Sequence, residues 1–125
     1  AQRHGLEDRI RIVESDSTLS NVPASSVDLA IFRGALFFPS LFKVDFSAIH
    51  RTLNREGIAL IGGGFGKYTP PEVINQIGKR SEKLNTALGR VRITVDSVRD
   101  QLRSNALEEK CEITTEGGLW VVLRK

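Results

Sequence analysis

The sequence has no methionine and only one cysteine, Cys111, among its 125 residues. A single cysteine cannot form an intrachain disulfide or a cysteine metal cluster, and it fits a reducing, cytoplasmic compartment. No apolar run approaches the roughly 20 residues that span a bilayer, and the chain does not open with a signal peptide. We therefore expect no membrane partner. Because residue 1 is not a translation start, we expect a processed chain or a piece of a longer protein.

The distribution of charge gives no sign of a nucleic-acid partner. The chain has 18 basic and 15 acidic residues, a net charge of +3 and no basic block, so we expect no nucleic acid. Its two histidines lie far apart and give no metal site of recognised spacing. No G-x-S-x-G motif supports acyl transfer. The hydrophobic content of 40% is ordinary for one globular domain, which we assign to residues 1–125.

Hydrophobic patterning predicts alternating strands and helices in the first half. Residues 10–13 form a short candidate strand, and the apolar run over residues 27–32, broken only by Asp28, suits a strand buried on both faces. Phe46, Ile49 and Leu53 share one helical face. A turn at Gly57 then leads into a strand over residues 58–61.

The second half predicts two helices followed by a hairpin. Thr69 precedes two prolines and should cap a helix, whose buried face comprises Val73, Ile74, Ile77 and Leu84. Thr94 caps the next helix. Strands over residues 111–115 and 119–123 are joined at Gly117-Gly118 and must be antiparallel. The order β, β, α, β, α, α, β, β predicts an α/β fold with a mostly parallel sheet that ends in an antiparallel hairpin.

Five segments in this order resemble the C-terminal part of a class I S-adenosylmethionine-dependent methyltransferase, which has a Rossmann-like fold. They cover residues 5–16, 26–34, 49–57, 94–107 and 111–125. The family's glycine-rich loop after strand one and its acid after strand two have no counterpart, so N-terminal strands one and two are missing. The family's strand three would then lack its normal neighbour. Either a preceding segment was lost, or this strand is rearranged or paired with another chain.

The resemblance implies a cofactor site at the carboxyl ends of the strands. Asp16 would accept a hydrogen bond from the adenine amino group of S-adenosyl-L-methionine, and the backbone of Ser17 would face a ring nitrogen. Arg33 and Gly34 would line the methionine part of the cofactor. The residues themselves also allow simpler roles: a loop or capping aspartate, an exposed arginine at a strand end, and a turn glycine.

A glycine-rich stretch offers a rival site. Gly62, Gly64 and Gly66 follow a strand and spell GxGxG, which is a phosphate-loop signature. Against this, the prolines at 70 and 71 start the next helix late. The other interpretation is a flexible loop on the substrate side of the sheet.

We therefore carry two main hypotheses for the function. The first is a methyltransferase that acts on an unknown small-molecule acceptor, with no assigned catalytic residue and no metal. The second is a truncated, non-catalytic module that binds a partner or forms a homodimer through exposed sheet edges. Phe37, Phe38 and Phe42 could line an apolar pocket, although a role in the core is the simpler interpretation.

Overall fold

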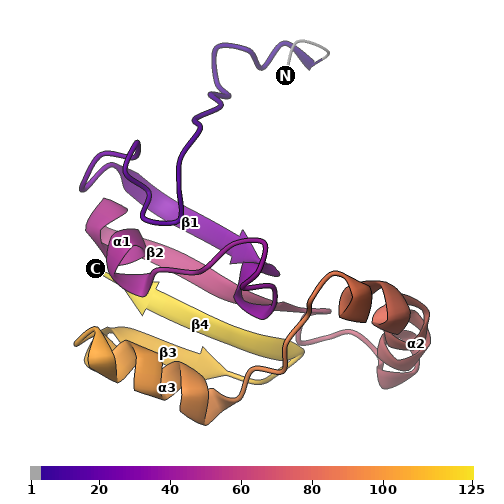
Figure 1. The fold of residues 1–125 in the computed structure, drawn as a ribbon. Coiled ribbons are helices and arrows are strands. Elements are labelled where there is room, and N and C mark those ends of the chain that lie inside the picture. Colours follow the sequence, from indigo (N-terminus) through magenta and orange to yellow (C-terminus); the bar gives the residue numbers. More distant parts are fainter. Residues whose placement is uncertain (1–3) are drawn as a thin grey trace.

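The computed structural model describes residues 4–125, in which helices and one sheet alternate along the chain (Figure 1). Strand β1 is followed by a short 3-10 helix, η2, and then by α1 and β2. Two further helices precede the closing strands β3 and β4. The bounds are β1 Val27–Arg33, η2 Ala35–Phe37, α1 Phe46–Thr52, β2 Leu53–Gly64, α2 Pro71–Ala87, α3 Val95–Ser104, η3 Glu108–Lys110, β3 Cys111–Thr114 and β4 Gly118–Arg124.

The four strands form one mixed sheet in the order β1-β2-β4-β3. β1 and β2 are parallel, whereas β4 is antiparallel to both of its neighbours. The predicted α/β fold and the closing antiparallel hairpin are confirmed. The expected mostly parallel sheet is confirmed only for the β1–β2 pair, because β4 inserts between β2 and β3.

The strand predicted over residues 10–13 is wrong. These residues pair with no strand in the part of the chain that the structure describes, and the Ile12 side chain is 95% exposed. An extended segment becomes a strand only when a neighbour accepts and donates its backbone hydrogen bonds. The segment leads instead into a loop ahead of β1.

Burial of β1 on both faces is also wrong. Ala30 and Phe32 pack against the hydrophobic core, but Leu29 and Ile31 are 57% and 60% exposed. Successive side chains of a strand point to opposite faces, so the helices that cover one face leave the other open. The apolar run therefore places apolar side chains on both faces of β1, but the described residues cover only one of these faces.

The predicted turn at Gly57 lies inside β2. Val27 pairs with Leu53 but Leu29 pairs with Ile58, so extra β2 residues bulge out of the β1 pairing. Glu56 within this bulge has a φ of 66°. A bulge of this kind bends the strand and breaks the local ladder.

Helix α2 differs from its predicted form. It begins at Pro71 with Pro70 as N-cap, and no side chain caps it, because the Thr69 hydroxyl donates instead to the Phe65 carbonyl. None of its residues is buried: Val73, Ile77 and Leu84 are 39%, 45% and 62% exposed. The helix lies beyond the carboxyl ends of β1 and β2 rather than on the sheet (Figure 1). Its predicted buried face is therefore wrong.

Helix α3 and the hairpin follow the sequence prediction. The Thr94 hydroxyl accepts from the Ser97 backbone NH at 3.1 Å, and the Ser97 hydroxyl accepts from the Thr94 NH at 3.2 Å. This reciprocal capping box satisfies two donors at the helix start. Gly117, with a φ of 72°, turns the chain into β4.

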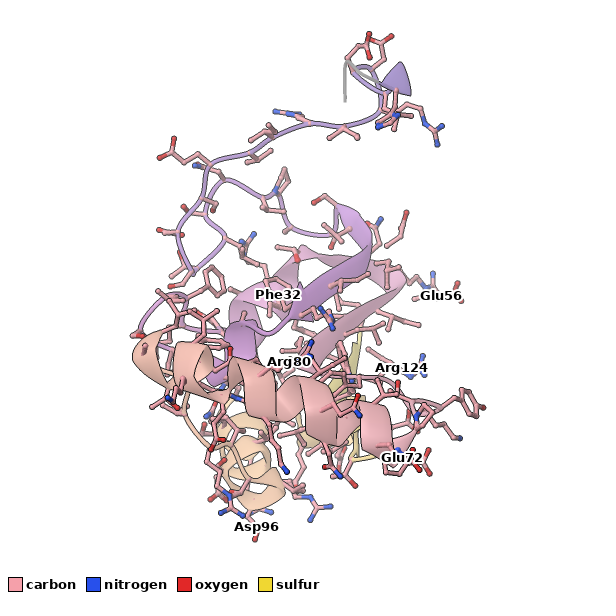
Figure 2. The ribbon with its side chains drawn as sticks, turned by 90° about the vertical axis from the view of Figure 1, so that its right-hand side faces the viewer. Phe32, Glu56, Glu72, Arg80, Asp96 and Arg124 are labelled. Carbon is pink, nitrogen blue, oxygen red and sulfur yellow. The ribbon has the colours of Figure 1, made fainter. Side chains whose placement is uncertain are left out.

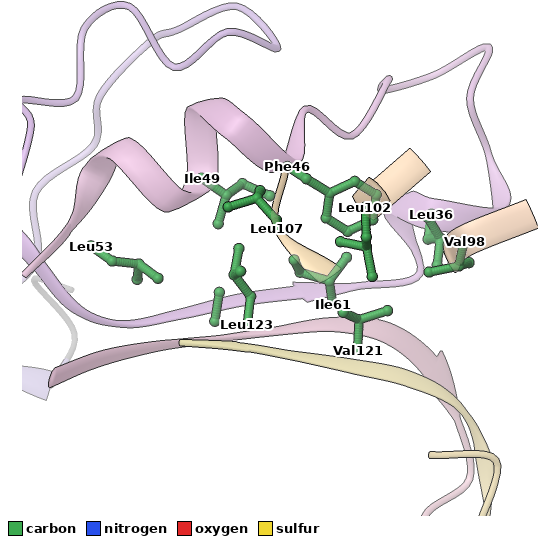
Figure 3. Packing of buried hydrophobic residues seen from close by; sticks show 11 residues of the cluster. Leu36, Phe46, Ile49, Leu53, Ile61, Val98, Leu102, Leu107, Val121 and Leu123 are labelled. Atoms are coloured by element: carbon green, nitrogen blue, oxygen red, sulfur yellow. The ribbon is translucent and has the colours of Figure 1, made fainter. Parts of the chain in front are cut away.

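The core lies between the sheet and the helices α1 and α3 (Figure 3). Phe46 and Ile49 of α1 are 2% and 1% exposed, and Val98 and Leu102 of α3 are 0% and 1% exposed. Ile61 of β2 lies among them. In residues 4–125 no helix combines the length and apolar content needed to cross a membrane.

Candidate functional site

The loop before β1 is organised around the Asp16 carboxylate. Its Oδ1 accepts from the Thr18 hydroxyl at 2.6 Å and from the Thr18 NH at 3.2 Å. The NH and hydroxyl of Ser20 donate to the same oxygen at 3.3 and 3.2 Å. The structure thus gives Asp16 the loop-forming role that the sequence left open, with the side chain exposed to solvent.

These hydrogen bonds predict an acidic titration for Asp16. The Thr18 hydroxyl, followed by the Ser20 NH, holds the pKa of this carboxyl below its ordinary value of 3.8. Ionised Asp16 therefore stabilises the loop fully at a pH above its ordinary pKa. This stabilisation is lost as the pH falls through the lowered pKa of the folded protein. An NMR titration of the Asp16 carboxyl carbon should find this midpoint. In Thr18→Ala the midpoint should rise; an unchanged midpoint would contradict the prediction.

A second contact fixes the same loop to α1. The Arg51 guanidinium, near the end of α1, donates to the Leu19 carbonyl at 2.8 Å and to the Val22 carbonyl at 3.1 Å. The Thr18 carbonyl is a third, longer acceptor at 3.5 Å. Residues 18–22 are therefore held on the helical side of the sheet.

Arg33 and Gly34 lie together at the carboxyl end of β1. The exposed Arg33 guanidinium donates through Nη2 to the Gly64 carbonyl at 3.3 Å, which directs it along the end of the neighbouring strand. Gly34 has a φ of 91°, and no atom lies within 4 Å of where its Cβ would stand. The backbone conformation, rather than crowding, therefore favours glycine, and Gly34 serves as the turn into η2.

A cavity of about 710 Å³, which we call the loop cavity, lies between the Asp16 loop and the helices. Its volume is within the range of small-molecule sites. Ser17 and Thr18 line one side, and Leu36 and Pro39, which follow β1, line another. Phe46 and Asp45 at the start of α1 contribute a third wall.

The structure therefore brings only part of the predicted site together. Ser17 shares the loop cavity with residues that follow Gly34 in sequence, but Asp16, Arg33 and Gly34 do not line it. Asp16 precedes Ser17, which does line the cavity. Arg33 ends β1 and Gly34 is the N-cap of η2, the 3-10 helix that contains Leu36.

Most of the glycine-rich stretch is strand rather than loop, and of its three motif glycines only Gly66 lies in the segment between β2 and α2. Gly62 and Gly64 belong to β2 and pair with Trp120 and Gly118 of β4. A Cβ at Gly62 would stand 2.0 Å from the Leu119 carbonyl oxygen. These glycines therefore permit close contact between strands. Helix α2 begins only at Pro71, so its N-terminus does not abut the glycines as a phosphate loop requires.

Sequence reasoning missed a second cavity, which we call the helix cavity. Its volume is about 580 Å³, and it lies between one face of α2 and residues 90–93. Phe37 and Phe65 form apolar parts of its wall, so Phe37 lines a pocket as the sequence allowed. Phe42 instead stacks on Phe32, with the ring centroids 6.1 Å apart. Ile93 lines both cavities. Ile74, Gly78 and Asn85 share a helical face, a spacing that could have indicated this wall.

No group of three or more histidine, cysteine, aspartate or glutamate side chains suited to a metal ion occurs within residues 4–125. Burial raises the pKa of the Cys111 thiol to about 11. The thiol is therefore neutral at physiological pH and unsuited to nucleophilic attack.

The chain is similar in structure to a solved protein, although its sequence matches no family model. No protein-family model matches the sequence, and no curated protein matches it. A solved structure from Methanococcus maripaludis, described as a "putative S-adenosyl-L-methionine-dependent methyltransferase", matches with a TM-score of 0.68 and 26% sequence identity. The match covers 99% of this chain but 58% of that chain. The chain thus has the α/β fold of part of such a methyltransferase domain.

Proposed function

We propose that the intact protein is a class I S-adenosyl-L-methionine-dependent methyltransferase that acts on a small-molecule acceptor, and that this chain forms the C-terminal part of its Rossmann-like domain. The observation that carries the proposal is the sheet itself. The sheet has a parallel β1–β2 pair followed by the inserted antiparallel β4. The Methanococcus maripaludis structure matches the fold of this chain over 99% of its length. Its 58% coverage of that longer chain agrees with a domain of which strands one and two lie outside these residues.

The described residues fit the cofactor in part. Ser17 faces the loop cavity, and the empty space beside Gly34 would admit a ligand close to the backbone at the end of β1. In this proposal Asp16 accepts from the adenine amino group, Ser17 offers its NH, and Arg33 and Gly34 line the methionine part. The Arg33 guanidinium is exposed and can pair with a carboxylate.

When bound, S-adenosyl-L-methionine would supply an activated methyl group for in-line displacement, in which the bond from sulfur to the methyl carbon breaks and the sulfonium becomes a neutral thioether. The residues of this chain would contribute to binding and orientation, which alone can lower the barrier substantially. We assign no general base, because this displacement depends mainly on proximity and orientation.

Calorimetric titration with S-adenosyl-L-methionine tests the proposal. We expect a dissociation constant in the micromolar range and about tenfold weaker binding by Asp16→Asn, because the hydrogen bond to the adenine amino group loses its charged acceptor. The matched control is Asp96→Asn, which makes the same change in the first turn of α3, away from the loop cavity. Equal affinity of the two variants would remove the assigned role of Asp16.

One observation favours a second candidate, a non-catalytic module that self-associates. The outer edge of β1 has no partner strand in residues 4–125, and its Leu29 and Ile31 are exposed. Antiparallel pairing of β1 with a second copy, centred on Ala30, would place Leu29 opposite Ile31. Such apolar cross-strand pairs stabilise a sheet. Absence of cofactor binding together with a dimeric mass in sedimentation would favour this candidate.

A further inference from the structure

The helix cavity has the mixed lining typical of a site for a small organic molecule. Phe37, Phe65 and Ile74 supply apolar walls. Asn75 and Asn85 add amide groups from α2. Sites of this kind bind the body of a ligand on apolar surface and orient it with a few polar groups.

The charges around this cavity are mostly positive. Lys79, Arg90 and Arg92 line it, against one acidic side chain, Glu82. Within residues 4–125, none of these four side chains takes part in an ion pair. The cations are therefore available to a ligand, and they favour a negatively charged one.

Arg90 is held in place by its contacts with the η2 segment. Its guanidinium lies over the Phe37 ring, 5.4 Å from the centroid, and the Val91 NH donates to the Phe37 carbonyl at 2.8 Å. The Arg90 NH is bonded to the Asn85 carbonyl at 3.0 Å. A guanidinium stacked on an aromatic ring keeps its in-plane donors free, and these match a carboxylate bidentately.

We propose that the helix cavity binds a small planar carboxylate, with its apolar part against Phe37 and Phe65 and its carboxylate on Arg90, with Arg92 and Lys79 beside it. The proposal rests on the lining of the cavity and not on methyl transfer. If the proposed function also holds, the shared residue Ile93 makes this cavity the neighbour of the loop cavity, and the acceptor would belong to the same chemical class.

The test is an NMR titration with cinnamate, using cinnamamide as the neutral probe of the same shape, and no S-adenosyl-L-methionine. Cinnamate should shift the backbone amide signals of α2 and residues 90–93 saturably. Cinnamamide should bind at least about tenfold more weakly, because a neutral amide cannot form the charge-assisted pair. Both Arg90→Gln and Arg92→Gln should weaken cinnamate binding while leaving cinnamamide binding nearly unchanged.

The matched control is Arg80→Gln, which removes one positive charge from α2 (Figure 2). Arg80 does not line the cavity. Its affinity for cinnamate should equal that of the unchanged protein. Arg92→Gln preserves the contact between Arg90 and Phe37, so it remains informative if Arg90→Gln disturbs the local fold. Equal binding of the two probes, an absence of saturable shifts at millimolar cinnamate, or an equal loss in Arg80→Gln would overturn the proposal.

Discussion

Gly62→Ala is expected to lower the free energy of unfolding by about 3 kcal/mol, the upper end of the cost of an overpacked site. The Cβ would stand 2.0 Å from the Leu119 carbonyl oxygen and 2.9 Å from the Trp120 Cα, so two backbones must separate. Gly62 also has a φ of 151°, which L residues rarely adopt. Urea unfolding followed by the fluorescence of Trp120, the one tryptophan in the sequence, measures this loss at the affected strand pair.

Gly78→Ala is the matched control for this substitution. Gly78 lies within α2 and has no positive φ, and apart from its chain neighbours and the backbone of its own helix nothing lies within 4 Å of its added Cβ. Alanine should therefore stabilise the helix by up to about 1 kcal/mol, the difference in helix propensity. The explanation would fail if Gly62→Ala and Gly78→Ala had the same effect on unfolding.

Phe46→Ala is expected to cost about 3–5 kcal/mol, which is the usual range for removing a buried phenyl ring. Phe46 is 2% exposed and packs in the core where α1 meets the sheet. A domain of this size has a total stability of only about 5–15 kcal/mol, so the loss would be a large fraction of it. Because Phe46 also lines the loop cavity, the substitution should widen that cavity.

The milder Phe46→Leu substitution keeps the measurement possible if the alanine variant does not fold, and it should cost less. Leu41→Ala is the control, since Leu41 is 67% exposed and its removal should change the stability by no more than about 0.5 kcal/mol. Thermal unfolding monitored by circular dichroism gives all of these values. A loss in Leu41→Ala equal to that in Phe46→Ala would contradict the assigned packing.

The sequence predicted elements whose signals are local. Thr94 caps α3 through Ser97 within one turn, and Gly117 forms the turn of the hairpin. The sequence therefore predicted both the helix start and the hairpin. The errors concern burial, which depends on distant partners. Ile12 and Leu84 are apolar and regularly spaced, yet no described segment covers them, and hydrophobic pattern alone cannot reveal that a partner is absent.

The candidate site was predictable only in outline. Arg33 and Gly34 were expected at the end of a strand and lie there, because β1 carries a strong apolar signal. The bonds of Asp16 to Thr18 and Ser20 are a local motif that the sequence allowed but could not distinguish from ligand binding. The helix cavity escaped prediction because Phe37, Ile74 and Arg90 meet only through the packing of separate segments.

The position of β4 has a consequence for synthesis on the ribosome. The strand made latest among those described is an inner strand, flanked on both sides by β2 and β3. Until β4 has left the exit tunnel, β2 has an unpaired edge, because the strand that pairs with it is not yet free to fold. The β1–β2 pair therefore keeps an open edge until β4 is available, and a change that weakens residues 118–124 would expose this edge to aggregation.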